Sequence, residues 1–415
     1  MKKLGIIFVS IAALLAYVPV YGADNFTLEI TSEGQTYNQG FSAIEDAINN
    51  LDTDAIEAQI SNYTDTSAAS GTINFRGLKI NLSVPANSTA ITIDIPSINV
   101  NQTFTGATRD ASVDQLEDWL KKEAGGIVTE IMQWLAANSA TDPIAGNPVA
   151  LQSTMAAGSY DRGFTLATTE LEPRTIEAGE KNGNLAGVGF QFGYFDVGDS
   201  KVQSYTVPLS YTIRSNTNAR KKFTINMPIT ITDLEGANSY SVGLGGGLTW
   251  PITDRWALTP AFDYGFMGSI DLGSVGQIIS PSLTSSYSWP IRNMKLNMGN
   301  MIGYMESIEI SFDEYSFDPG ISNTVFRNGL MLYIPTDKFR KNTGIEVFIT
   351  DTRFTGNDLY IDSYNEIGFS WGSKKIVRKT VKGIIKNYLR DMRAGLTFTF
   401  ADDSEGISFN FGYTF

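Results

Sequence analysis

The second half of the chain alternates apolar with polar or small side chains, residue by residue, in one segment after another. In the segment 186–194, one face carries Val188, Phe190, Phe192 and Tyr194, and the other carries Gly187, Gly189, Gln191 and Gly193. This period of two is the signature of β-strands. Similar runs follow at 204–213, 222–232, 242–250, 256–266, 278–290, 294–304, 323–335, 343–352, 359–372, 390–400 and 406–415. The pattern predicts an all-β fold of about twelve antiparallel strands over residues 184–415.

Two architectures fit this alternation: a soluble barrel with its apolar face inward, and a membrane barrel with its apolar face toward lipid. The run lengths favour the membrane, because strands of about 9–11 residues cross a bilayer. The strand ends also carry the aromatic residues that interfacial girdles use: Tyr194, Phe195, Trp250, Trp256, Phe266, Trp289, Tyr333 and Trp371. The small and polar faces then line the lumen, and they include Gly187, Gly189, Gln191, Thr224, Asn226, Gly243 and Gly245.

Both termini of the chain carry targeting patterns. Residues 1–22 read as a secretory signal peptide, with Lys2 and Lys3 before a short apolar run and small residues at the end. A membrane anchor is the alternative, but the run is shorter than the roughly 20 residues that a spanning helix needs. The last strand ends in alternating aromatics, Phe409, Phe411, Tyr413 and Phe415, which resemble the signal read by the barrel-assembly machinery of Gram-negative outer membranes.

An even strand number places both ends of the barrel in the periplasm. The short links 251–254 and 290–293 then fall on the periplasmic side, and longer links at 267–276 and 306–319 fall outside. The segment 374–391 reads as a basic amphipathic helix on the inner leaflet, or else as two extended strands with a polar turn.

The first half of the chain is organised differently. Residues 23–110 predict a small α+β domain in the periplasm or at the surface, with helices in 41–60, strands at 72–84, 90–95 and 98–104, and a bulge at Gly77. Residues 111–183 predict an amphipathic helix and then a linker, with a short helix from Asn147 and an optional strand at 164–171.

The amphipathic helix over 112–138 is a candidate plug. About 25 residues span roughly 37 Å, enough to cross a barrel. Its candidate plug residues are Leu116, Trp119, Leu120, Gly125, Gly126, Ile131 and Trp134. The alternative is that its tryptophan-rich stripe packs on the small domain.

The composition excludes several chemistries. The chain has no cysteine and no histidine, so disulfides, thiolate or imidazole metal ligands and a Ser–His–Asp triad are excluded. A formal charge of −13 argues against nucleic acid as a partner. Acidic residues at 306–318 fit a solvated loop better than a cation site. No enzyme, metal or cofactor is therefore expected, and the expected partners are outer-membrane lipid, lipopolysaccharide and the assembly machinery.

Three stretches carry a family resemblance: YTVPLSYTIRS at 205–215, KKFTINMPITITDLEGANSYSVGLGGGLTWPITDRWALTPAFDYG at 221–265, and SNTVFRNGLMLYIP at 322–335. With the preceding helix, they resemble autotransporter translocator domains, and more closely the solitary outer-membrane barrels of that type. The resemblance implies an export or transport conduit. The long linker after the helix departs from the family, and so does the lack of an Asn–Asn pair in 113–137, so passenger self-cleavage does not carry over.

Two functions therefore stay open. One is a conduit for a solute or polypeptide that is gated by residues 112–138. The other is a closed barrel that anchors the N-terminal domain or displays loops to partners.

Overall fold

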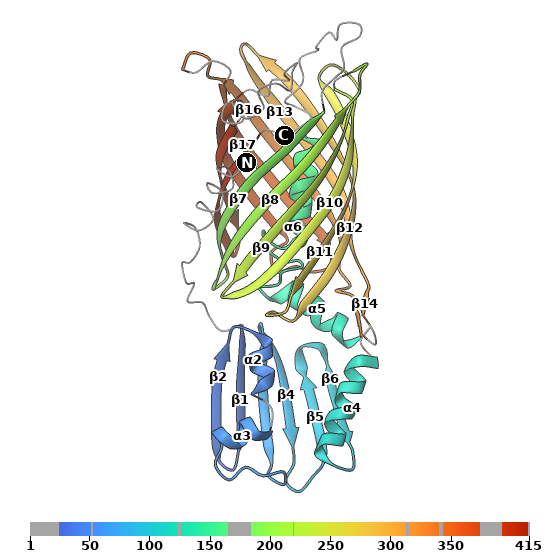
Figure 1. The fold of residues 1–415 in the computed structure, drawn as a ribbon, viewed down its shortest axis with the longest axis vertical. Helices are drawn as coiled ribbons and strands as arrows, with labels where there is room; N and C mark the ends of the chain where they lie inside the picture. The colour runs from blue at the N-terminus through green and yellow to red at the C-terminus, as the bar shows by residue number, and fades with distance from the viewer. Residues whose placement is uncertain are drawn as a thin grey trace, which may run out of the picture.

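The computed structural model describes residues 25–50, 53–122, 126–164, 184–218, 220–312, 315–339, 343–373 and 392–413. The signal peptide, the basic segment 374–391 and Phe415 lie outside these residues, as does nearly all of the optional strand at 164–171. Figure 1 shows a tall barrel with a small N-terminal domain at one of its mouths.

The barrel is closed and has twelve antiparallel strands, as predicted. Its strands are β7 (Leu185–Val197), β8 (Ser200–Arg214), β9 (Lys222–Leu234), β10 (Ala237–Pro251), β11 (Trp256–Ser269), β12 (Ser274–Ile291), β13 (Met294–Ile308), β16 (Ser322–Pro335), β17 (Thr343–Gly356), β18 (Ser363–Ser373), β19 (Met392–Ala401) and β20 (Ser404–Tyr413). Closure comes from the pairing of the last strand with the first, where Phe409 lies opposite Phe192.

The wall of the barrel is apolar outside and polar inside. Large apolar side chains such as Ile229, Leu244 and Ile349 are between 44 and 55% exposed, whereas Thr259 and Thr352 are completely buried. A soluble protein has the opposite distribution. The outer face therefore lies against lipid, and the barrel crosses a membrane. Within the described residues, no helix combines the length and the apolar character that crossing a membrane would require.

The N-terminal domain is a six-stranded antiparallel sheet in the order β2-β1-β3-β4-β5-β6. Its elements are β1 (Phe26–Ser32), β2 (Gln35–Phe41), α2 (Ile44–Asn49), α3 (Thr53–Gln59), β3 (Ala69–Phe75), β4 (Leu78–Val84), β5 (Ala90–Ile95), the 3₁₀ turn η1 (Pro96–Ile98) and β6 (Val100–Thr105). The single bulged strand predicted for 72–84 is wrong. Arg76 and Gly77 have φ of 51° and 98°, which suits the tight turn of a β-hairpin between β3 and β4.

The predicted plug helix is two helices, α4 (Arg109–Lys122) and α5 (Ile127–Asn138). Leu116, Trp119, Ile131 and Trp134 pack against the apolar core of the N-terminal sheet, and the Trp119 ring lies 5.5 Å from that of Phe104. Leu120 lies in α4, Gly126 precedes α5, and Gly125 lies outside the described residues. The expectation that this helix threads the lumen is wrong, because its apolar stripe finds an apolar sheet rather than the polar lumen.

The two mouths of the barrel are distinguished by what lies at them (Figure 1). At the terminal mouth, β7 begins and β20 ends, together with the short links after β10 and β12. The N-terminal domain lies at the other, the domain mouth, where Asn25 donates to the Leu234 carbonyl and the Ile44 amide donates to Asp271. The long link predicted at 267–276 is wrong, since β11 and β12 leave only residues 270–273 between them. The link after β13 is long and carries a small hairpin of β14 (Ile310–Phe312) and β15 (Tyr315–Phe317).

Candidate functional site: the filled lumen

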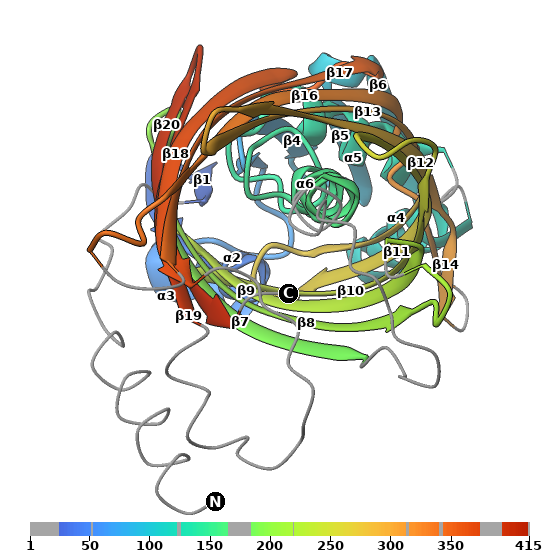
Figure 2. The ribbon, with the colours of Figure 1, turned by 90° about the horizontal axis from the view of Figure 1, so that it is seen from above.

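A helix lies inside the barrel, where the sequence predicts only a short helix from Asn147 within a linker. This helix, α6 (Leu151–Gly163), belongs to the stretch predicted as a linker, and Figure 2 shows it within the ring of strands. We refer to residues 139–164 as the lumenal segment. Along α6 the buried residues include polar ones, Gln152, Ser153, Ser159 and Arg162, beside Leu151, Met155 and Tyr160. The buried residues of α6 are polar and apolar in turn and form no single apolar stripe, so periodicity does not identify their surroundings.

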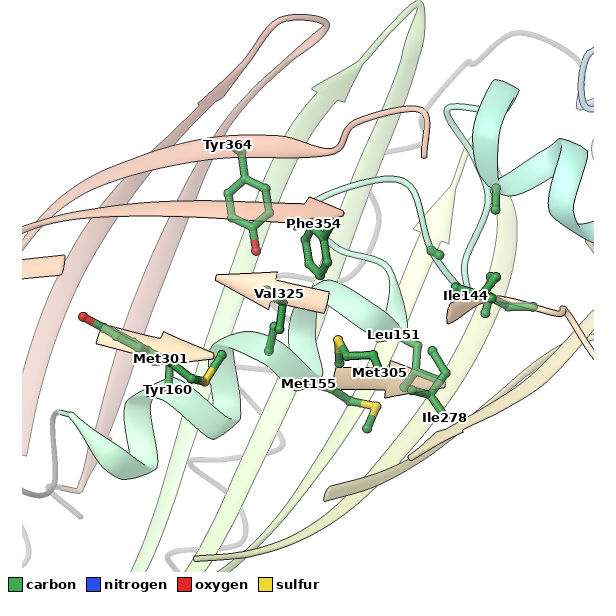
Figure 3. Close-up of a cluster of buried hydrophobic side chains, with 14 of the residues drawn as sticks. Ile144, Leu151, Met155, Tyr160, Ile278, Met301, Met305, Val325, Phe354 and Tyr364 are labelled. Atoms are coloured by element: carbon green, nitrogen blue, oxygen red, sulfur yellow. The ribbon is translucent and has the colours of Figure 1, made fainter. Parts of the chain in front are cut away.

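The apolar side chains of α6 meet a patch of the barrel wall that is apolar although it faces inward. Leu151, Met155 and Tyr160 form one buried cluster with Ile278, Met301 and Met305 from β12 and β13 (Figure 3). Methionine suits such a place, because its flexible side chain fills irregular gaps. The helix is thus held against one side of the lumen.

Glycines in the wall make room for α6. A Cβ added at Gly265 would collide with Met155, one at Gly299 with the Phe164 ring, and one at Gly329 with the Tyr160 hydroxyl. At Gly245 and Gly247 it would collide with Arg162. These wall glycines therefore form a groove that fits α6.

Polar contacts fix the register of α6 in that groove. The Arg162 guanidinium forms an ion pair with Asp263, and its Nε donates to the Asn226 Oδ1 at 2.6 Å. Ser159 and Ser282 hydroxyls lie 2.6 Å apart, and Gln152 donates to the Asn323 Oδ1 at 2.9 Å. Arg162 and Asp263 side chains are only 2 and 8% exposed, so this pair is strongly desolvated.

The other side of the lumen holds a cavity of about 460 Å³. Its wall is rich in hydroxyl groups and carries two further ion pairs. Arg327 pairs with Glu366, and Arg393 pairs with Glu346 at 3.0 Å. Arg393 also donates to the Ser370 hydroxyl at 2.8 Å. The charges within each of these two pairs cancel, and apolar side chains such as Phe190 and Phe348 also line the cavity.

The domain mouth is closed by an apolar layer. Val149 of the lumenal segment packs with Phe195, Val202, Leu234 and Leu272, which come from the ends and turns of the strands. Phe195, which the sequence placed in the aromatic girdle, is 5% exposed and points into this layer. This layer and α6 thus both occupy the lumen, the layer at the domain mouth and α6 farther inside.

A buried ion pair joins the N-terminal domain to the lumenal segment. Arg76 Nη1 lies 3.5 Å from Asp142 Oδ2, and its Nη2 donates to the Ser274 hydroxyl at 2.9 Å. Burial raises the pKa of the Asp142 carboxyl above its usual value and lowers that of the Arg76 guanidinium, while the attraction between the two charges opposes both shifts. The Asp142 carboxylate also accepts hydrogen bonds from the backbone amides of Ile144 and Ala145, at 2.9 and 3.0 Å. These bonds fix the backbone where the chain enters the barrel.

The predicted lumen residues lie around this site. The cavity is lined by Gly189, Gln191, Thr224, Asn226 and Gly243, and Gly245 faces Arg162. Gly187 lies on β7, half-buried. Sequence reasoning predicted a short helix from Asn147 but not its place in the lumen, and it missed the roles of Arg162 and Asp263. The signal that was available is Asp263 itself, a carboxylate in the middle of a predicted membrane strand, where a charge needs a partner.

The predicted assembly residues lie on β20. Phe409 and Phe411 are 42 and 37% exposed on the outer face, and Tyr413 is the last residue of the strand. No group of carboxylates that could hold a metal ion is present in the described ranges, which omit part of the acidic 306–318 link.

The two mouths carry opposite charge. Among the described residues, the rim of the domain mouth carries Asp196, Asp199, Asp233, Glu235, Asp271, Glu306, Glu309, Asp318, Asp358, Asp362, Asp402, Asp403 and Glu405, against Lys201 and Arg353. The rim of the terminal mouth carries Arg214, Arg220, Lys221, Lys222, Arg255, Arg292, Lys295, Lys338 and Arg393, against Asp254, Asp337 and Glu346, the partner of Arg393. All four barrel tryptophans, Trp250, Trp256, Trp289 and Trp371, also lie at this end.

No family model matches the chain, and no curated protein matches it. Solved structures resemble its fold. The translocator domain of the autotransporter NalP from Neisseria meningitidis is 12% identical, with a TM-score of 0.41 over 56% of this chain and 89% of that one. The β-domain of the Bordetella autotransporter BrkA is 9% identical, with a TM-score of 0.41 over 56% and 99%. An outer membrane channel from Pseudomonas putida F1 is 10% identical, with a TM-score of 0.38 over 59% and 100%. Identities and TM-scores of this size leave both the fold and the function of this chain to be argued from its own residues.

Proposed function

We propose that this protein is an outer-membrane barrel of a Gram-negative bacterium that holds its own N-terminal domain at the cell surface, with the lumen closed by the connecting chain. One observation carries the proposal. The domain lies at one mouth, β7 begins at the other, and residues 139–164 between them lie inside the barrel. In this proposal, the barrel is the conduit through which its own N-terminal segment passes. The closed mouth and the fitted helix favour anchoring over passage of a free solute.

The orientation rests on the C-terminal strand. The aromatic end of β20, which resembles an assembly signal, lies at the terminal mouth, and assembly machinery reads such signals from the periplasm. The domain mouth then faces outward. Connection lengths do not separate the mouths, because both have links of only two residues, such as 198–199 and 292–293. The removal of residues 1–22 as a signal peptide belongs to this proposal, and we assign the protein no catalytic role.

The absence of native cysteine allows a direct test of orientation. Ser83 is exposed on β4 of the domain, and Asn293 is exposed in the β12–β13 turn. We expect a membrane-impermeant maleimide to label Ser83→Cys in intact cells, and to label Asn293→Cys only after the outer membrane is permeabilised. The opposite pattern would place the domain in the periplasm and contradict the proposal. Labelling of both variants in permeabilised cells is the matched control for folding and access.

A further inference from the structure

The rim of the terminal mouth has the composition of a lipid-headgroup surface. Three of its connections each place an exposed apolar side chain beside a basic one. Phe339, 92% exposed, follows Lys338; Ile252, 44% exposed, lies near Arg255; and Ile291, 40% exposed, precedes Arg292. An apolar tip that enters the interface, with a cation beside it, is how peripheral segments hold anionic membranes.

The outer wall at the same rim repeats the combination. Lys221 Nζ lies 3.6 Å from the centre of the Trp250 ring, and Trp250 is 46% exposed toward lipid. Tryptophan marks the level of the headgroups, so Lys221 lies where the phosphates lie. The Arg220–Asp254 pair at 3.7 Å neutralises one acidic residue of the rim. The opposite rim is acidic throughout its connections and has none of the barrel tryptophans within the described residues.

We propose that this basic rim binds the phosphodiester headgroups of anionic phospholipids through Lys221, Arg255, Arg292 and Lys338. The partner follows from charge complementarity: the rim presents separated cations around an apolar belt, which suits many single phosphates in a bilayer rather than one soluble ligand. The rim thereby holds the terminal mouth at the leaflet that is rich in anionic phospholipid. The binding itself does not depend on the proposed orientation, since both leaflets of a vesicle have the same composition.

The fluorescence of the four rim tryptophans is the readout of the test. The folded protein is placed in vesicles of phosphatidylglycerol and phosphatidylcholine at one fixed ratio, with brominated chains on one lipid or the other. Bromine quenches nearby tryptophan, and Trp119 and Trp134 of the N-terminal domain supply a constant background. We expect brominated phosphatidylglycerol to quench more, with an apparent preference of roughly fivefold or more, given about 1 kcal/mol for each basic residue at an anionic surface. High salt should abolish the preference.

The variant Lys221→Gln/Arg255→Gln/Arg292→Asn/Lys338→Gln should lower the preference severalfold, because these four cations are the ones proposed to bind the headgroups. Its matched control, Asp199→Asn/Asp358→Asn/Asp402→Asn/Glu405→Gln, alters four charges at the opposite rim and should leave the preference unchanged. Equal quenching by both brominated lipids in the unmodified protein would overturn the inference, and so would an undiminished preference in the basic-rim variant. Displacement of phosphatidylglycerol from the rim by lipopolysaccharide would also overturn it. The salt titration on the unmodified protein tests the inference even if a variant fails to fold.

Discussion

A barrel that lacks residues 25–164 is expected to conduct ions in a planar bilayer, whereas the full chain stays closed. The deletion removes α6 and the part of the mouth layer that Val149 supplies, and it leaves a polar lumen inside twelve strands. Polar walls do not collapse on themselves as an apolar core does, so the freed space fills with water. Large, steady conductance steps should therefore appear with the truncated protein alone.

The matched control is a barrel that lacks residues 25–138 and keeps the lumenal segment. It has lost the N-terminal domain but retains every contact of α6, and it should remain closed. Conductance from this control would show that the domain, rather than the lumenal segment, closes the barrel. A silent truncated barrel, with folding confirmed by heat-modifiable migration, would show that the wall fills its own lumen.

Removal of Arg162 is expected to destabilise the closed barrel. The expected loss of stability is far larger than the loss of a surface ion pair would cause. Arg162→Met leaves the Asp263 carboxylate buried without its partner, which costs on the order of 3–5 kcal/mol. The same reasoning applies to Asp263→Asn, which leaves the guanidinium unpaired. Both single variants should show frequent channel openings, and both should unfold at lower denaturant concentration than the unmodified barrel.

The double variant Arg162→Met/Asp263→Leu is expected to recover much of the loss, because it buries no charge at all. Arg353→Met is the control. That arginine pairs with Asp351 at 3.2 Å but is 68% exposed, so its removal should change stability by about 1 kcal/mol or less. Openings in the double variant as frequent as those of the two single variants combined would contradict a coupled pair.

The sequence predicts the strands and the two faces of the barrel wall, but for the lumenal helix it predicts only a short helix from Asn147 and not its place inside the barrel. The difference has a physical reason. The barrel wall faces lipid on one side and a polar lumen on the other. Its strands therefore alternate apolar and polar side chains with a period of two over residues 185–413. The helix α6 has mixed surroundings on every side, with Met155 against methionines and Arg162 against Asp263. Its sequence therefore carries no period. For the stripe of Trp119 and Trp134 the sequence left two partners open, the lumen and the small domain. The stripe packs on the apolar core of the domain sheet.

Two other misses have local causes. The strands β1 and β2 are absent from the prediction. In β2 only Phe41 is buried, so it has little apolar alternation to detect, whereas β1 alternates and was simply missed. The hairpin at Arg76 and Gly77 was taken for a bulge, since a two-residue turn and a bulge both shift the apolar parity by one.

A single disulfide tests the central claim, that α6 lies fixed against β12 inside the lumen. Ser159 and Ser282 hydroxyls are 2.6 Å apart, and the chain has no other cysteine to compete. We predict that Ser159→Cys/Ser282→Cys forms an intramolecular disulfide in the folded, membrane-inserted protein, and that Ser159→Cys/Ser408→Cys, with the second residue across the cavity on β20, does not. A bridge to position 408 in place of 282, or free thiols in both variants, would contradict the filled lumen.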